Sequence, residues 1–159
     1  MRIYICGAYP RRDTFRERAS QLRAIGHEIT SSWLEETWDP NTPLTALDRA
    51  QRTEIAMQDM AEVIESDALL AFTEPADTPY TRGGRHWELG VATCCAVHQG
   101  WGKDVLNGYR VFIVGPREHI GHDLPLVEHY ETFYDFVKFG LRATRNEIDR
   151  VFEDGNHAV

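Results

Sequence analysis

Short apolar segments alternate with helical segments along the chain, and this alternation constrains the fold more than any other feature. Residues 2–6 form the first apolar run, which Gly7 ends, and Asp67–Thr73 and Tyr109–Val114 are near-continuous runs of the same kind. Short runs without polar alternation are typical of strands that are buried on both faces, as in a parallel sheet. His27–Leu34 is predicted as the remaining strand of a set of four.

The segments between these runs carry apolar residues at helical spacing. Asp13 is a suitable N-cap for the first helix, and Gly26 lies just beyond its last apolar residue. Helices are therefore predicted over residues 13–25, 50–64, 83–98 and Thr132–Glu153. Val127–Tyr130 could add a short extra strand.

The order of these elements predicts an α/β fold in one domain over residues 1–159. It is a flavodoxin-like or Rossmann-like parallel sheet of four to five strands, with helices on both faces. A chain of 159 residues has the size of one such domain. Ligands bind at the carboxyl ends of the strands in open sheets of this kind. The candidate site is therefore expected in residues 7–12, 31–38, 73–85 and 115–122.

Composition excludes several classes of function. The net charge is −8, from 17 Lys and Arg against 25 Asp and Glu, which argues against binding to a nucleic-acid polymer. A small phosphorylated ligand is still allowed, because a pocket can be locally basic. No apolar run approaches the roughly 18 residues of a membrane span, and no signal peptide is recognisable. The three cysteines form no CxxC motif, so we expect them to be reduced in a cytoplasmic protein.

Glu88 is the strongest candidate for a catalytic residue. It lies in Gly-Gly-Arg-His-Trp-Glu-Leu-Gly at residues 83–90, about one turn into the predicted third helix. Two glycines let a ligand approach the backbone, and the helix N-terminus is expected to keep the carboxylate ionised. An ionised carboxylate at a sheet edge suits covalent glycosyl chemistry. The alternative is an acid that only complements the helix dipole.

Two other residues could act together with Glu88. Tyr4 lies near the end of the first strand, where its phenol could hold a carboxylate by hydrogen bonding; alternatively, it packs in the core. Asp59 is in line with Ile55 and Val63 on the second helix. A partly apolar setting could raise its pKa and make it a general acid, whereas the alternative is a solvated helix acid.

Basic and aromatic side chains occur in the loops at the same predicted edge. Arginines there suggest recognition of a phosphate or carboxylate, although they could equally pair with nearby acids. Aromatic rings could stack on a nucleobase or pack in the core. The residues predicted to bind substrate are Gly7, Tyr9, Arg12, Trp33, Arg82, Gly83, Gly84 and Arg85.

Signatures of metals and nucleotide cofactors are missing from the sequence. His119 and His122 are three residues apart, but the sequence places no third ligand beside them, so no metal site is predicted. The glycines form neither a GxGxxG fingerprint nor a Walker loop. We therefore expect a protein without a cofactor.

Four motifs, taken in order, resemble the nucleoside 2-deoxyribosyltransferase superfamily, which includes the nucleoside 5'-monophosphate N-glycosidases. The resemblance runs from about Arg2 to Phe136. It implies that Tyr4 is the active-site tyrosine, Asp59 the conserved aspartate and Glu88 the nucleophile. The motifs that carry it are Ile-Tyr-Ile-Cys-Gly at residues 3–7, Gln-Asp-Met at 58–60 followed by Ser-Asp at 66–67, Trp-Glu-Leu-Gly at 87–90 and Val-Gly-Pro-Arg-Glu at 114–118.

One position departs from the pattern of that superfamily. The transferases usually carry an aspartate six residues before the nucleophile, and Arg82 stands there instead. An arginine favours an anionic substrate, so this change points towards a nucleoside 5'-monophosphate, or towards hydrolysis rather than base exchange.

The resemblance implies cleavage of an N-glycosidic bond through a covalent glycosyl-Glu88 intermediate, by hydrolysis or by transfer to another base. The substrate is then a small nucleoside or nucleotide. Two other functions stay open, namely a catalytically silent nucleotide-binding or sensing module and an enzyme that resembles an NAD glycohydrolase. A homodimer or higher homo-oligomer is also expected, from the resemblance, the apolar helix with Trp87, Val91, Cys94 and Cys95, and the aromatic residues of the last helix.

Overall fold

The computed structural model describes residues 1–36, 46–75, 77–78, 83–100 and 108–152. Its centre is a five-stranded, entirely parallel sheet with the order β2-β1-β3-β4-β5. This is the flavodoxin-like order, so the predicted α/β fold class is confirmed, including the fifth strand. The strands are β1 (Arg2–Cys6), β2 (Glu28–Ile29), β3 (Ala68–Phe72), β4 (Arg110–Val114) and β5 (Val127–Tyr130).

Burial explains why the central strands read as continuous apolar runs. All five residues of β3 are buried, and the last four residues of β1 and of β4 are buried as well. Each of these strands pairs with a strand on both sides and is covered by helices on both faces, so neither face contacts water. The side chains of β1, β3 and β4 therefore form the middle of the core.

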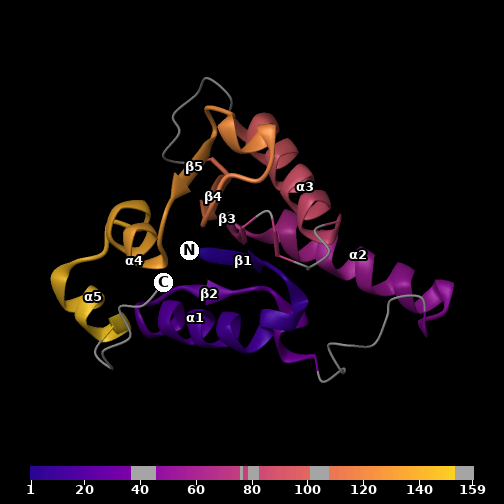
Figure 1. Cartoon of the computed structure of the whole chain (residues 1–159), viewed down its shortest axis with the longest axis horizontal. Helices are drawn as coiled ribbons and strands as arrows, with labels where there is room; N and C mark the ends of the chain where they lie inside the picture. Colours follow the sequence, from indigo (N-terminus) through magenta and orange to yellow (C-terminus); the bar gives the residue numbers. More distant parts are fainter. Residues whose placement is uncertain (37–45, 76, 79–82, 101–107, 153–159) are drawn as a thin grey trace.

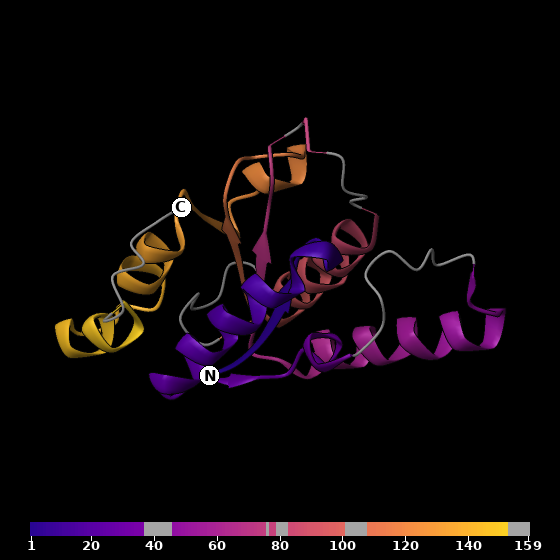
Figure 2. The same cartoon turned by 60° about the horizontal axis from the view of Figure 1, so that its bottom comes forward.

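Helices cover the two faces of the sheet in separate groups (Figure 1). On one face α1 (Arg12–Ala24) packs against the C-terminal helix α5 (Arg145–Phe152). On the other face α3 (Gly83–Gly100) lies on β3 and β4 and packs against α2 (Arg49–Glu65). The N-terminal half of α2 reaches away from the sheet (Figure 1, Figure 2). No helix in the described ranges is long and apolar enough to cross a membrane.

The predicted second strand is much shorter than expected. It was expected over His27–Leu34, but β2 ends at Ile29 and a 3₁₀ helix, η2, follows at Ser32–Glu35. Side chains take over the hydrogen bonds that a longer ladder would make: the Ser31 hydroxyl accepts from the Ile5 amide, and a Glu62 carboxylate oxygen accepts from the Ser32 amide at 3.0 Å. The apolar residues that suggested a strand are therefore buried by a helical turn instead.

The predicted last helix is interrupted. Instead of one helix over Thr132–Glu153, the described part of this region holds α4 (Phe133–Asp135), a π-helical turn η5 (Phe136–Gly140) and α5. Arg142, between η5 and α5, has a φ of 56°, which no helix allows. Thr144 then starts α5, where its amide and hydroxyl both donate to the Glu147 carboxylate, at 2.7 and 2.6 Å. Residues 153–159 lie outside the described ranges.

Candidate active site

The sheet order places a natural ligand site between β1 and β3. The chain turns to β2 on one side of β1 and to β3 on the other, so the loops that leave β1 and β3 diverge and open a crevice at their carboxyl ends. Cys6 ends β1 beside Ala71 of β3, and α3 begins after the loop that follows β3. The side chains at this point come from segments that are far apart in the sequence.

Tyr4 and Glu88 meet in this crevice. The Tyr4 hydroxyl donates a hydrogen bond to Glu88 Oε1 at 2.9 Å. Tyr4 is fully buried, whereas Glu88 is half-buried on the sixth residue of α3. Burial, followed by the nearby Glu88 and Asp59 charges, raises the pKa of the Tyr4 phenol far above its ordinary value. Tyr4 therefore stays a hydrogen-bond donor at every physiological pH.

Glu88 is a carboxyl group with a raised pKa. Its pKa is raised to about 7, and burial is the largest cause. Asp59 adds to the rise, whereas the hydrogen bonds with Tyr4 and Cys6 and the charge of Arg85 oppose it. Burial thus opposes ionisation, and the raised pKa does not support the expectation that the helix N-terminus keeps Glu88 ionised. In the free protein Glu88 exchanges its proton near neutral pH.

Asp59 faces the same pair of side chains from α2. Burial raises its pKa to about 6, Glu62 raises it further, and a hydrogen bond with Tyr4 lowers it. Tyr4 therefore interacts with both carboxyl groups. Among the described residues, neither Glu88 nor Asp59 has a Lys or Arg ion-pair partner within 4 Å. The two carboxyl groups therefore share the site with a phenol. Between pH 6 and 7 we expect the pair to hold one proton, distributed between the two groups.

Cys6 is a site residue that the sequence reasoning did not assign. It is two residues after Tyr4 on β1, so both side chains leave the same face of the strand. The Cys6 thiol hydrogen-bonds to Glu88, and burial with the Glu88 charge raises the pKa of the thiol. The alternation of side chains along the strand was a signal that could have found it.

Arg85 lies in a buried ion-pair network instead of facing the crevice. Its guanidinium contacts Glu74 and donates to Glu118 Oε2 at 2.6 Å and to the Phe72 carbonyl at 2.8 Å. Arg85 is 5% exposed and Glu74 is 2% exposed. The prediction that Arg85 binds substrate therefore has no support in this arrangement, because its charge is neutralised by carboxylates of the protein itself.

Tyr9 and Arg12 pack together at the end of β1. The Arg12 guanidinium lies 4.8 Å from the centre of the Tyr9 ring and donates to its hydroxyl. Both residues are half-buried. Glu36 is the third member of this group: burial raises the pKa of its carboxyl group, and Tyr9 and Arg12 lower it. These two predicted site residues are adjacent, at the β1 side of the crevice.

Trp33 and Gly7 serve the core. Trp33 is 7% exposed, and its indole N–H donates to the Ile5 carbonyl at 2.8 Å, so the alternative of core packing describes it and a stacking role for its ring is not supported. A Cβ on Gly7 would collide with the ring of Phe15, so the need for glycine there follows from packing against α1. The structure gives no sign that Gly7 is kept free for a ligand.

The glycines before Glu88 begin α3 as predicted. Gly83 is the first residue of the helix, and a Cβ on Gly84 would contact nothing within 4 Å. The backbone at Gly84 is therefore open to an approaching group. Arg82, the residue that departs from the superfamily pattern, lies outside the described residues.

Three histidine rings gather beside the Arg85 network. The ring of His86 lies 5.4 Å from that of His119 and 6.4 Å from that of His122. The Nδ1 atoms of His119 and His122 each accept a backbone N–H, and burial lowers the pKa of His122. Within the part of the chain that the structure describes, no group of His, Cys, Asp or Glu side chains is arranged to hold a metal ion.

Comparisons with known proteins give a likeness of fold. No protein-family model matches the sequence, and no curated protein matches it. The fold is similar to that of a CMP N-glycosidase from Clostridium botulinum, BcmB, with 16% sequence identity and a TM-score of 0.49, over 90% of this chain and 100% of that one. At this identity and TM-score the likeness assigns no activity to the chain, so the function is argued from the crevice itself.

Proposed function

We propose that this protein cleaves the N-glycosidic bond of a nucleoside, a deoxynucleoside or a nucleoside 5'-monophosphate, with Glu88 as the nucleophile. The observation that carries the proposal is the hydrogen bond from Tyr4 to Glu88 beside Asp59, with both carboxyl groups shifted towards neutral pKa values. Enzymes that cleave glycosidic bonds commonly use two carboxyl groups in one site, one as the nucleophile and the other as the general acid. The motif resemblance supports the same assignment.

The first chemical step requires an ionised Glu88 and a protonated Asp59. This is the less populated arrangement of the shared proton in the free protein, because the pKa of Glu88 is about 7 and that of Asp59 about 6. A Glu88 carboxylate oxygen attacks the anomeric carbon and forms an ester bond, while the bond from that carbon to the base nitrogen breaks. Its electron pair leaves with the base, which takes the Asp59 proton directly or through water. Tyr4 keeps its own proton throughout and orients the attacking carboxylate.

The second step returns the protein to its starting state. A water molecule attacks the anomeric carbon of the glycosyl ester, gives its proton to the Asp59 carboxylate and releases Glu88 as a carboxylate. A second base in place of water would give transfer instead of hydrolysis. Because each step inverts the anomeric carbon, both outcomes retain its configuration overall.

Base release from a substrate panel tests the proposal. Purified protein is incubated with nucleosides, deoxynucleosides, their 5'-monophosphates and NAD, with and without an acceptor base, and the products are separated by chromatography. We expect release of base from at least one nucleoside or nucleotide, and loss of that activity in Glu88→Gln. Release from NAD alone would favour the NAD glycohydrolase alternative. Binding without release by the wild-type protein would favour the silent sensing module.

A 5'-phosphate is the preferred form of the substrate in this proposal. The predicted arginines at this edge motivate it: Arg12 is the first residue of α1, after the loop that follows β1, and Arg82 replaces the expected acid in the sequence. A charge-assisted contact contributes about 1.5–3 kcal/mol, or about ten- to a hundredfold in affinity. The ratio of kcat/KM for a monophosphate and its nucleoside measures this preference, and it should fall in Arg82→Ala. Equal turnover of both forms would contradict the phosphate preference and leave the glycosidase proposal standing.

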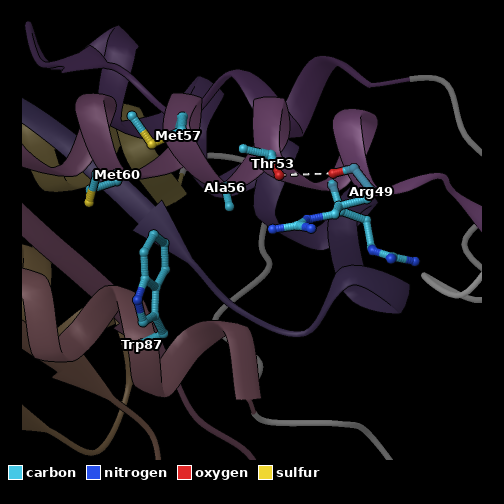
Figure 3. Close-up of a pocket in the computed structure, with 7 residues that line it drawn as sticks. Arg49, Thr53, Ala56, Met57, Met60 and Trp87 are labelled. Carbon is cyan, nitrogen blue, oxygen red and sulfur yellow. Dashed lines mark hydrogen bonds between the residues drawn. The ribbon is translucent and has the colours of Figure 1, made fainter.

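We also propose that a second copy of the chain covers the outer face of α2 and α3. Of the 17 residues of α2, Val63 is the one that is fully buried, so much of the helix surface is uncovered. Met57, Ile64, Trp87 and Val97 are exposed by 57%, 50%, 44% and 38%, and clefts of about 280 and 770 Å³ lie along this face. Figure 3 shows the Trp87 ring directed from α3 towards Met60 of α2.

Charge complementarity favours a second copy as the occupant of this face. The helix α2 begins with exposed Arg49 and Arg52 and ends with exposed Glu65, so two antiparallel α2 helices would place opposite charges together. Two helices from each copy would then bury a common apolar seam. Sedimentation should show a dimer at micromolar concentration and a monomer for Met57→Glu/Ile64→Glu. A wild-type monomer would contradict this assembly.

A further inference from the structure

The buried guanidinium of Arg85 connects three segments at the carboxyl edge of the sheet. It bonds to the Phe72 carbonyl at the end of β3 and to Glu74 just beyond it, and it donates to Glu118 in the connection between β4 and β5. The other oxygen of Glu118 accepts the Glu74 amide at 2.9 Å. The first turn of α3 is thereby tied to two strand ends at once.

Among the described residues at the start of α3, Arg85 is the buried side chain, and the half-buried His86 adds ring contacts with His119 and His122. Gly83 and Gly84 are its first two residues, and each glycine disfavours a helix by about 1 kcal/mol relative to alanine. A side chain at Gly84 would contact nothing within 4 Å. The next two buried apolar residues of the helix are Leu89 and Ala92, which lie beyond Glu88 or beside it. Arg85 is therefore the buried anchor on the N-terminal side of Glu88.

Glu88 follows Arg85 by three residues, which is close to one helical turn. The helix is stiff over that distance, so a shift or rotation of the turn at Arg85 moves the Glu88 carboxylate relative to Tyr4. Their contact is one hydrogen bond of 2.9 Å, which a displacement of about 1 Å would break. The positive charge of Arg85 also acts on Glu88 directly and lowers the pKa of its carboxyl group.

We propose that Arg85 is a positioning residue: by tying the first turn of α3 to the end of β3 and to the β4–β5 connection, it holds the Glu88 carboxylate against Tyr4. This inference rests on the proposed function only in calling Glu88 the nucleophile. It gives Arg85 an indirect role in place of direct contact with substrate. An ion-pair network that serves stability alone would leave the Tyr4–Glu88 contact intact when it is weakened.

The choice of variants follows from the charges of the network. Removing Arg85 outright would take the central cation from Glu74 and Glu118 and, among the described residues, leave Glu74 only the more distant Arg11, at 3.6 Å. Breaking a buried ion pair in this way costs about 3–5 kcal/mol and could unfold the protein. Arg85→Lys keeps the positive charge and loses the planar fork that reaches three partners. Glu118→Gln keeps Arg85 and Glu74 as a balanced pair and weakens one tie. Arg110→Lys is the matched control, since Arg110 pairs with Glu128 at 2.8 Å at the opposite end of the sheet.

The test is the titration of Glu88, followed by the ¹³C signal of its carboxyl group and assigned with Glu88→Gln. Tyr4 donates to Glu88 and lowers its pKa, so a displaced Glu88 should titrate at higher pH. We expect Arg85→Lys and Glu118→Gln to shift the titration upwards and Arg110→Lys to leave it unchanged. Loss of the Glu118 negative charge acting on its own would shift it downwards, so the sign separates displacement from electrostatics.

A double-mutant cycle with Tyr4→Phe makes the test specific. If Arg85 acts through the Tyr4–Glu88 contact, the shifts caused by Arg85→Lys and Tyr4→Phe are not additive, and the double variant titrates close to Tyr4→Phe alone. We also expect Arg85→Lys to lower kcat by about ten- to a hundredfold, with KM nearly unchanged. Additive shifts would overturn the inference. A folded Arg85→Lys in which Glu88 titrates as in the wild-type protein would overturn it too. If Arg85→Lys does not fold, the same result in Glu118→Gln would overturn it. A wild-type protein that releases no base would contradict the proposed function, while the titration would still decide the role of Arg85.

Discussion

Two groups of carboxylates lie at the same edge of the sheet, and they differ in burial and in their partners. Glu74 and Glu118 surround the Arg85 guanidinium and are nearly inaccessible to solvent, with side chains exposed by 3% and 4%. Glu88 and Asp59 face a phenol and, for Glu88, a thiol. The first group has a cation inside it, and the second group has neutral hydrogen-bond donors.

This difference indicates which acids hold the fold and which can react. A buried carboxylate that binds a guanidinium has its oxygens engaged inside the protein, so it is not available to attack a carbon. A buried carboxylate without one has a raised pKa and gains or loses its proton near neutral pH, which is typical of functional sites. Here the pKa values of Asp59 and Glu88 are raised to about 6 and about 7.

The largest expected effect comes from removing the unpaired acid that attacks the sugar. Glu88→Ala should lower kcat by at least about 10⁴-fold, because no neighbouring group can form the ester in its place. Rates of base release and a circular dichroism spectrum measure activity and fold together. If Glu88 only complemented the helix dipole, the variant would lose about 0.3–1 kcal/mol of stability and stay active. For comparison, Glu118→Gln, which changes a carboxylate that pairs with Arg85, should lower kcat by about tenfold at most.

The second effect depends on the leaving base. Asp59→Asn should slow substrates with poor leaving bases by about 10²–10⁴-fold, because a general acid helps most when the base must leave protonated. Activated bases, which leave without a proton, should be affected far less. Parallel rate measurements with one activated and one poor leaving base check this. An equal loss for both would mean that Asp59 has another role, such as holding the sugar.

The third effect is on the pH dependence of kcat/KM. Activity needs Glu88 ionised and Asp59 protonated, which is one arrangement of the single proton that the pair holds between its two pKa values, so it should rise as the pH passes about 6 and fall above about 7. The result is a narrow bell centred between these values, whose limbs belong to the coupled pair. Tyr4 lowers the pKa of both acids, so Tyr4→Phe should move both limbs to higher pH. Limbs that do not move in Tyr4→Phe would contradict the shared contact.

The smallest effect is on stability, and its sign is opposite for the two groups. Since folding raises the pKa of Glu88, deprotonation costs stability as the pH rises from the ordinary value of 4.5 to about 7. Glu88→Gln should therefore stabilise the protein at pH 8 by about 1–2 kcal/mol, or about 2–8 °C in Tm, and by little at pH 4. Glu118→Gln should instead destabilise it at pH 8. Thermal melts at both pH values distinguish these results, and a loss of stability in Glu88→Gln at pH 8 would contradict the raised pKa.

Most of the fold could be predicted because the central strands are buried on both faces. Their apolar runs are local in the sequence, and so are Gly7 and Gly115, which follow β1 and β4. The predictions of the second strand and of the last helix were wrong for the same reason. In both regions, apolar residues are buried by irregular turns, so burial does not indicate a regular strand or helix. A local signal for the break in the last helix was present: Thr144 is followed three residues later by Glu147, which is the pattern of a helix start.

The site was less predictable, because its partners are distant in the sequence. Tyr4 and Glu88 are separated by 84 positions and Arg85 and Glu118 by 33, and no periodicity links them. The Tyr4–Glu88 contact agrees with the motif resemblance, whereas Arg85 and Trp33 were assigned to substrate from residue type alone. Residue type does not show whether an arginine already has carboxylate partners inside the protein. A basic residue in a predicted binding loop needs that check first.

Trapping the glycosyl ester tests the central claim most directly. A substrate analogue with fluorine at the 2-position of the sugar and a good leaving base should form the ester and then hydrolyse slowly, because fluorine destabilises the positive charge in the second step. Digestion and mass spectrometry should then show the mass of the fluorosugar on the peptide that contains Glu88, and no adduct in Glu88→Gln. An adduct on a different residue, or turnover of the natural substrate by Glu88→Gln at the wild-type rate, would contradict this account.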